Sequence, residues 1–238
     1  MKRSIIHLMV FCVMLSAALP ASGDGIDEEI SRLRKIVEEK GYSFTVGRTP
    51  LTGLSGEELR ARTGFVPPSK EAWDALPKFS PPPVNLSGAD ITDPVFDWRA
   101  LGAVTAIRDQ LLCGSCWAFA AIAELESQIL IYDGVMMDLS EQQMIDCNMQ
   151  EKDCDGGNAW AAYEVLQNAG AVTESCIPYT QSDGNICTQE SCTRVAYIDG
   201  WATIQNNVTA IKTALLSGPV YTAFRTSGLF NSYTGGCF

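Results

Sequence analysis

The sequence predicts an α+β protein of two subdomains, a helical one followed by one built from strands. Helical periodicity dominates residues 116–170, whereas residues 171–205 are rich in Thr, Gly and Cys and suit loops and short strands. A proline-rich stretch, "LPKFSPPPVNLSG" at 76–88, separates both from the preceding residues. Helices grouped before strands indicate subdomains of different class and not an alternating β/α sheet.

The first residues resemble an export signal. Lys2 and Arg3 precede an apolar run over 5–19, and small residues follow at Ala21 and Gly23. This order is typical of a signal peptide, here residues 1–23, cleaved before Asp24. The run is too short for a typical membrane span, so we expect a secreted or lumenal protein without membrane contact after signal removal.

Residues 24–91 predict a short helical segment and then a linker. The stretch "IDEEISRLRKIVEEK" at 26–40 carries apolar residues at helical spacing, and Gly41 ends it. A second helix is indicated over 55–64, where Ser55 and Glu58 match a capping box. Three consecutive prolines then exclude a regular helix and mark a domain boundary.

The main domain is expected over residues 92–238. A largely buried helix is predicted at 116–131, starting at Cys116. Ser140 and Gln143 match a capping box for the next helix. Further helices are expected at 158–170 and 207–217, and "VYTAF" at 220–224 is a strand candidate.

The charge balance makes nucleic acid an unfavourable partner. The chain has 28 acidic and 17 basic residues, a net charge of −11. Such a surface repels phosphate backbones. Carboxylate repulsion relaxes at low pH, so a lysosomal, endosomal or vacuolar compartment is compatible with this composition.

The stretch "LLCGSCWAFA" at 111–120 allows four interpretations of its two cysteines. A redox pair would need a strand-to-helix turn inside a βαβ unit, which is not visible. A zinc site would need a second closely spaced ligand pair, and residues 24–238 contain no histidine, so no metal is expected. A disulfide within the stretch would be strained. A nucleophilic thiol is the fourth interpretation.

The nucleophile interpretation has a physical basis. Cys116 stands at the start of a predicted helix, where the helix dipole favours the thiolate. Six residues earlier, the side-chain amide of Gln110 could join the Cys116 backbone N–H in stabilising an oxyanion.

The sequence here resembles the papain-like cysteine peptidases, whose signature is Cys-Gly-Ser/Ala-Cys-Trp/Tyr. Three more stretches are similar to the family: "FDWRALGAVTAIRDQ", "LSEQQMIDC" and "CDGGNAW". The resemblance implies a papain-like fold with a helical left subdomain and an antiparallel, barrel-like right subdomain, here C-terminally incomplete. It also implies a Cys116 nucleophile, a Gln110 oxyanion donor, and substrate contacts at Gly156, Gly157 and Trp117.

The resemblance further implies the disulfide pairing and the role of the early residues. The implied pairs are Cys113 with Cys154, Cys147 with Cys187, and Cys176 with Cys192. Residues 24–91 are similar to the short propeptide of the cathepsin B branch, which would act as the enzyme's own inhibitor. One departure stands out: Leu111 and Leu112 replace the small, polar residues usual in the family after the glutamine.

The second half of the catalytic site is not found in this sequence. The family's histidine and asparagine are expected about 130–150 residues after the cysteine, beyond Phe238, and the one histidine is His7. We therefore expect a truncated chain that is inactive by itself.

Two functions follow as hypotheses. The first is a thiol endopeptidase acting through Cys116 on peptide or protein substrates, monomeric and without a cofactor. The alternative is a noncatalytic secreted protein that binds peptides in the retained cleft.

Overall fold

A computed structural model of the chain describes residues 23–67, 69–78, 87–236 and 238, and falls into two compact units. The predicted signal peptide, part of the linker and Cys237 lie outside the described residues. Unit 1 combines residues up to Ser55 with residues from Thr226 onward, and unit 2 runs from Gly56 to Arg225. No helix in the described ranges is long and apolar enough to cross a bilayer.

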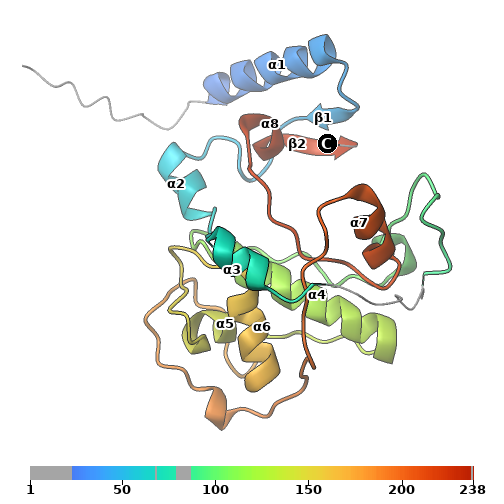
Figure 1. The fold of residues 1–238 in the computed structure, drawn as a ribbon. Helices are drawn as coiled ribbons and strands as arrows, with labels where there is room; N and C mark the ends of the chain where they lie inside the picture. Colours follow the sequence, from blue (N-terminus) through green and yellow to red (C-terminus); the bar gives the residue numbers. More distant parts are fainter. Residues whose placement is uncertain (1–22, 68, 79–86, 237) are drawn as a thin grey trace, which may run out of the picture. The chain divides into compact units, whose positions relative to one another are not determined.

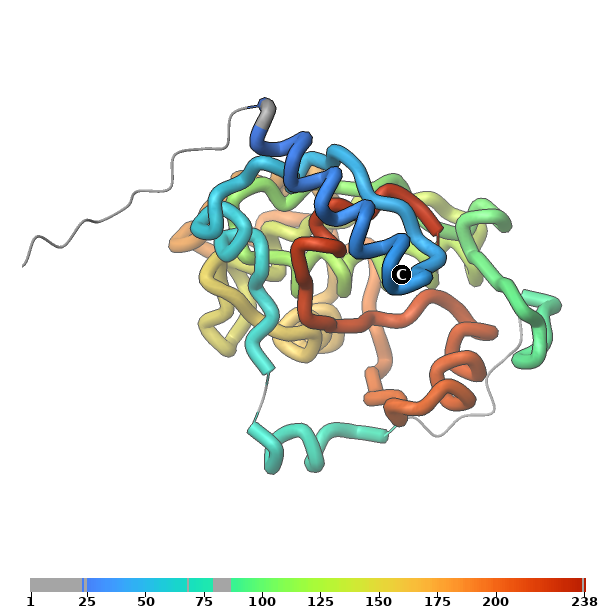
Figure 2. Tube along the Cα trace, turned by 90° about the horizontal axis from the view of Figure 1, so that it is seen from above, coloured from blue at the N-terminus to red at the C-terminus, as the bar shows by residue number. Residues whose placement is uncertain are grey.

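Unit 1 packs one helix on a two-stranded sheet (Figure 1), and Figure 2 shows the trace of the same helix in blue. Its elements are α1 (Gly23–Lys40), β1 (Phe44–Val46), α8 (Gly228–Asn231) and β2 (Tyr233–Gly236). The strands are antiparallel, with Phe44 opposite Gly236 and a register irregularity after Thr45. Leu33 of α1 is buried against Phe44 and Val46, which explains the helical spacing of its apolar residues.

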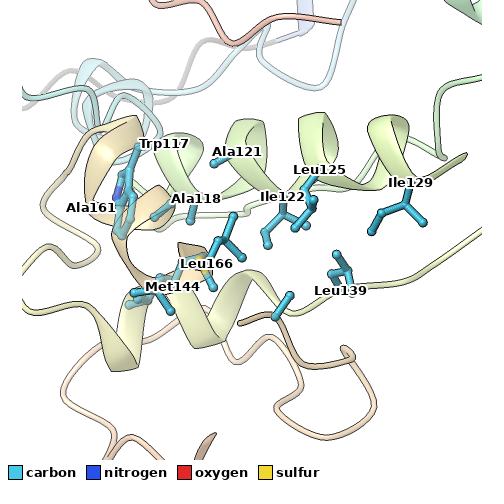
Figure 3. Packing of buried hydrophobic residues seen from close by; sticks show 14 of the residues in the cluster. Trp117, Ala118, Ala121, Ile122, Leu125, Ile129, Leu139, Met144, Ala161 and Leu166 are labelled. Atoms are coloured by element: carbon cyan, nitrogen blue, oxygen red, sulfur yellow. The ribbon is translucent and has the colours of Figure 1, made fainter. Parts of the chain in front are cut away.

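Unit 2 is built around α4, with α5 and α6 on one side of it (Figure 1). The elements are α2 (Gly56–Ala61), α3 (Lys70–Ala75), η1 (Trp98–Leu101), α4 (Cys116–Asp133), α5 (Glu141–Cys147), α6 (Ala159–Asn168), η2 (Gln189–Ser191) and α7 (Val208–Leu215). Side chains of α4 such as Trp117 and Ile122 meet Met144 of α5 and Leu166 of α6 in a single core (Figure 3).

The predicted helix at 116–131 is confirmed and continues to Asp133. The capping prediction for α5 is half right. The Ser140 hydroxyl accepts the Gln143 N–H at 3.0 Å, but the Ser140 N–H bonds to the Val172 carbonyl. The Gln143 side chain instead bonds to the Gly170 carbonyl and the Val172 N–H, so it ties α5 to the chain after α6.

All three implied disulfides are present: Cys113–Cys154, Cys147–Cys187 and Cys176–Cys192. Cys116 is free. The strained bond within 113–116 is therefore not formed. The first disulfide instead ties the loop before α4 to the turn before α6.

The strand predicted at 220–224 was wrong. Residues 220–224 form no strand in the described chain, and the expected barrel-like sheet is reduced to isolated bridges, among them Ala171 with Ala196. A strand is stabilised by a paired neighbour, and none of the described residues pairs with 220–224. Conversely, β1 with β2 and helix α3 were not predicted.

The α4–α6 contact predicts a large cost for truncating its central side chain. Leu166 is fully buried. Leu166→Ala is expected to lower the free energy of unfolding by about 2–5 kcal/mol because it leaves a cavity. Chemical denaturation measures this. The control Val208→Ala, at a side chain that is 72% exposed, should change stability by less than about 0.5 kcal/mol, and a similar loss in both variants would contradict the packing argument.

Burial of Glu141 predicts a stability that falls as pH rises. Burial raises the pKa of Glu141 to about 7, with further upward contributions from Glu174 and Glu126. Because the pKa of Glu141 in the folded protein lies above the unfolded value of 4.5, the folded protein binds a proton more tightly than the unfolded chain. This proton binding contributes fully to the free energy of unfolding below pH 4.5, and the contribution is lost as pH rises towards 7. The free energy of unfolding is expected to fall by about 3 kcal/mol over this range.

Urea denaturation between pH 4.5 and 8 checks this slope. Glu141→Gln is expected to flatten it, because the amide does not ionise. Glu28→Gln, on an exposed part of α1, serves as the control and should keep the wild-type slope. An unchanged slope in Glu141→Gln would assign the pH dependence to other groups.

Candidate active site

Cys116 occupies the first position of α4 and is partly exposed. The buried residues of α4 that follow fix its place: Trp117 and Ala118 are fully buried. Ser115 precedes the helix without capping it through its side chain. The thiol therefore sits at the positive end of an 18-residue helix whose position the core determines.

A segment from residues 62–66 lies against this thiol. The backbone N–H of Gly64 hydrogen-bonds to Cys116 Sγ at 3.4 Å. Close by in sequence, the side chain of Gln110 donates through Nε2 to the Arg62 carbonyl at 3.1 Å. The structure thus brings the predicted nucleophile and the predicted oxyanion donor to the same short stretch of chain.

The other side of this segment pairs with the turn before α6. The Gly157 N–H donates to the Gly64 carbonyl at 2.6 Å, and the Val66 N–H donates to the Gly157 carbonyl at 2.7 Å. Phe65 and Gly157 form a parallel bridge. These two bonds hold an extended segment of the chain itself, and the substrate contact of Gly157 stays a prediction.

Glycines make this close approach possible. A Cβ on Gly64 would lie 1.5 Å from the Gly114 carbonyl oxygen, which no real structure tolerates. Gly156, at φ +132°, would place a Cβ 2.7 Å from the Gly64 carbonyl oxygen. Backbone therefore packs directly on backbone here.

Trp117 has a supporting position. It is fully buried, and a Cβ on Gly157 would lie 2.5 Å from its ring. Its Nε1 donates to the Asp153 carbonyl at 3.3 Å. The sequence predicted direct substrate contact for Trp117, but in this structure the ring packs beneath the turn that binds the segment.

Sequence reasoning missed Tyr179, which steadies the Gln110 loop. Its hydroxyl donates to the Gln110 carbonyl at 2.7 Å and lies 2.9 Å from the Ser115 hydroxyl. Burial raises the pKa of Tyr179, so the hydroxyl keeps its proton and remains a donor. Nothing local in the sequence marks this tyrosine, which is 69 residues from Gln110.

A second tyrosine lies near the thiol. Burial raises the pKa of Tyr221, with smaller electrostatic contributions from Cys116 and then Glu124. Glu124 also accepts a hydrogen bond from the Tyr163 hydroxyl, and burial raises the pKa of Glu124.

Among the described residues, no group of three or more His, Cys, Asp or Glu side chains is arranged to hold a metal ion.

A comparison with protein families identifies the family of residues 92–238. Residues 92–238 match the model of the papain family of cysteine proteases. The chain belongs to this family. Its signature cysteine is Cys116, which is the free thiol at the start of α4.

Individual relatives agree with this membership. The chain is 36% identical over 213 residues to "Probable cysteine protease RD21C" of Arabidopsis thaliana, covering 86% of this chain and 46% of that protein. It is 39% identical over 145 residues to "Thiol protease SEN102" of Hemerocallis sp., covering 60% and 40%. The chain thus spans about half the length of the relatives it matches.

Solved structures extend the likeness to the fold. A recombinant stem bromelain precursor matches with a TM-score of 0.73 and 30% identity, over 90% of this chain and 67% of that chain. Digestive procathepsin L2 from Tenebrio molitor larval midgut matches with 0.72 and 27%, over 90% and 70%. The two-subdomain papain-like fold class is confirmed.

The predicted cathepsin B branch was wrong, because the relatives are papain-like plant proteases. The assignment depended on the shortness of residues 24–91. Segment length is a weak criterion for a branch, since it records no side-chain contact of the site.

The glycine contact predicts that a single methyl group uncovers the thiol. Gly64→Ala is expected to displace the segment and to raise the alkylation rate of Cys116 by iodoacetamide at least tenfold, because the new Cβ has no room. Mass spectrometry of the Cys116 peptide measures the rate.

Gly200→Ala is the matched control, because a Cβ at Gly200 would meet no atom within 4 Å. It should alkylate at the wild-type rate. Equal rates for Gly64→Ala and wild type would mean that residues 62–66 do not limit access to the thiol.

Proposed function

We propose that the chain represents a cysteine-type endopeptidase in its zymogen form, with Cys116 as nucleophile. The observation that carries this is an extended peptide held against the thiol by Gly157 and Gln110. The arrangement already binds peptide backbone, which is the part common to all protein substrates. Residues 92–238 are the proposed peptidase domain, and no cofactor is needed for the chemistry.

The roles of the residues follow from acyl transfer. The Cys116 thiolate attacks the carbonyl carbon of the scissile bond. Negative charge then develops on the carbonyl oxygen, and the Gln110 amide stabilises it by donating a hydrogen bond. The carbon–nitrogen bond breaks as the leaving amine takes a proton, and water later releases the acyl group from sulfur.

Deprotonation of the thiol and protonation of the leaving amine both need an acid–base group beside the thiol. Residues 24–238 contain no histidine. An unassisted cysteine has a pKa of about 8.5, so little thiolate is present in an acidic compartment. We therefore propose that this chain has no appreciable turnover by itself, since loss of one member of a catalytic unit costs on the order of a million-fold in rate.

Residues 24–91 are proposed as a propeptide that inhibits in cis, preceded by the signal peptide 1–23. The contacts of residues 62–66 with Cys116 and Gly157 support this role. The proforms among the similar structures are in line with it. Secretion or delivery to a lysosome-like or vacuolar lumen, as a monomer, completes the proposal.

The noncatalytic peptide binder remains the second candidate. The Cys-Gly-Ser-Cys-Trp motif, with its cysteine, favours the peptidase over this candidate, because binding alone does not require a thiol.

The native product decides between the two functions. We expect an antibody against this chain to detect a product that is labelled at Cys116 by a peptidyl epoxide, a reagent directed at activated thiols. The purified 24–238 chain should hydrolyse no peptide substrate above the level of Cys116→Ala. A native product without label would favour the binder, and Cys116-dependent turnover by the purified chain would refute its proposed inactivity.

A further inference from the structure

The segment over the thiol presents one side chain to the site as well as its backbone. Arg62 Nη1 lies 3.0 Å from Asp109 Oδ1, and only 17% of the arginine side chain is exposed. The same residue's carbonyl accepts the hydrogen bond from Gln110. The charged side chain of Arg62 is therefore held by Asp109, which directly precedes the predicted oxyanion donor Gln110.

This side chain lies on a different part of the site from the Gly157 contact. Residues 64 and 66 bond to Gly157, while residue 62 bonds to Gln110 and Asp109. The Gly64 N–H, between them in sequence, reaches Cys116. A peptide bound along this path thus meets Gly157 on one side of the thiol and Asp109 on the other.

Asp109 is held by its own loop as well as by Arg62. Its Oδ1 accepts the Leu111 N–H at 2.8 Å, which fixes the carboxylate and lets Leu111 adopt φ +54°. That backbone bond is the largest cause of a lowered pKa at Asp109, with the hydrogen bond from Arg62 a further cause, so the group is ionised well into the acidic range.

The neighbouring side chains suit the aliphatic part of a basic residue. Leu111 and Leu112 are 42% and 47% exposed, and they stand where the family usually has small, polar residues. Methylene stems of arginine and lysine pack on such apolar surface while their charged ends reach a carboxylate. The site thus combines a fixed negative charge with apolar flanks.

We propose that Asp109, flanked by Leu111 and Leu112, forms a subsite for a basic peptide side chain on the side of Cys116 away from Gly157. This rests on the proposed function, because it names the peptide class that the same cleft accepts. Arg62 Nε is buried without a hydrogen-bond partner among the described residues. The subsite therefore recognises a charge and not the complete guanidinium fork, so lysine also fits.

A double-mutant cycle tests the Arg62–Asp109 pair within the chain, and the alkylation rate of Cys116 is measured for each variant. Arg62→Met keeps the bulk and removes the charge, and it should raise the rate about three- to tenfold. Arg62→Lys should stay within about twofold of wild type. Asp109→Asn should match Arg62→Met, and the double variant should be no faster than either single one. Asp133→Asn, an exposed carboxylate at the end of α4, controls for net charge.

A peptide in trans extends the test to recognition of a separate chain. The Gly64→Ala protein would be protected from alkylation by a synthetic peptide of residues 58–67 and by two analogues of that peptide, one with Arg62→Met and one with Arg62→Lys. The two basic peptides should protect at about three- to tenfold lower concentration than the neutral one, and Asp109→Asn should abolish this preference.

Equal protection by all three peptides, or an Arg62→Met rate equal to wild type, would overturn the proposal. Neither measurement requires turnover, so failure of the subsite is distinguishable from failure of the proposed peptidase activity.

Discussion

The burial of α4 is the constraint on which the rest of unit 2 depends. Its side chains fill the space against α5 and α6, with Trp117, Ile122, Met144 and Leu166 almost fully enclosed. A helix enclosed in this way cannot shift without opening cavities. The thiol at its first residue is therefore held in place by the core, while the loop before it and the turn before α6 are joined by the Cys113–Cys154 disulfide.

Close approach of backbone to backbone is the second physical theme. Hydrogen bonds between main chains recognise a peptide irrespective of its side chains, and they require that no Cβ intervene. Gly64 and Gly156 meet this requirement together, because a Cβ on either would lie within 3 Å of a backbone carbonyl oxygen. In this structure the chain's own residues 62–66 occupy this arrangement.

The subsite proposed at Asp109 would add selection by charge. Backbone pairing cannot discriminate between sequences, whereas a fixed carboxylate beside apolar side chains can. Asp109 adjoins Gln110 in sequence, and in this chain its partner is Arg62. Elsewhere, buried glutamates such as Glu126 and Glu141 have raised pKa values because burial disfavours their charge.

The sequence by itself determined most of the longer helices, and its resemblance to the family gave the disulfide pairing. Helical periodicity and caps are local properties, so α1, α4, α6 and α7 were predictable within a few residues. The Cys-Gly-Ser-Cys-Trp motif assigned the thiol, and family resemblance assigned the three disulfides. Tertiary structure alone decided the rest: Tyr179 reaches Gln110 across 69 residues, Arg62 reaches Asp109 across 47, and β1 pairs with β2 across nearly the whole chain. Contacts between residues so distant in sequence leave no periodic pattern, because they depend on where the packed core places each loop.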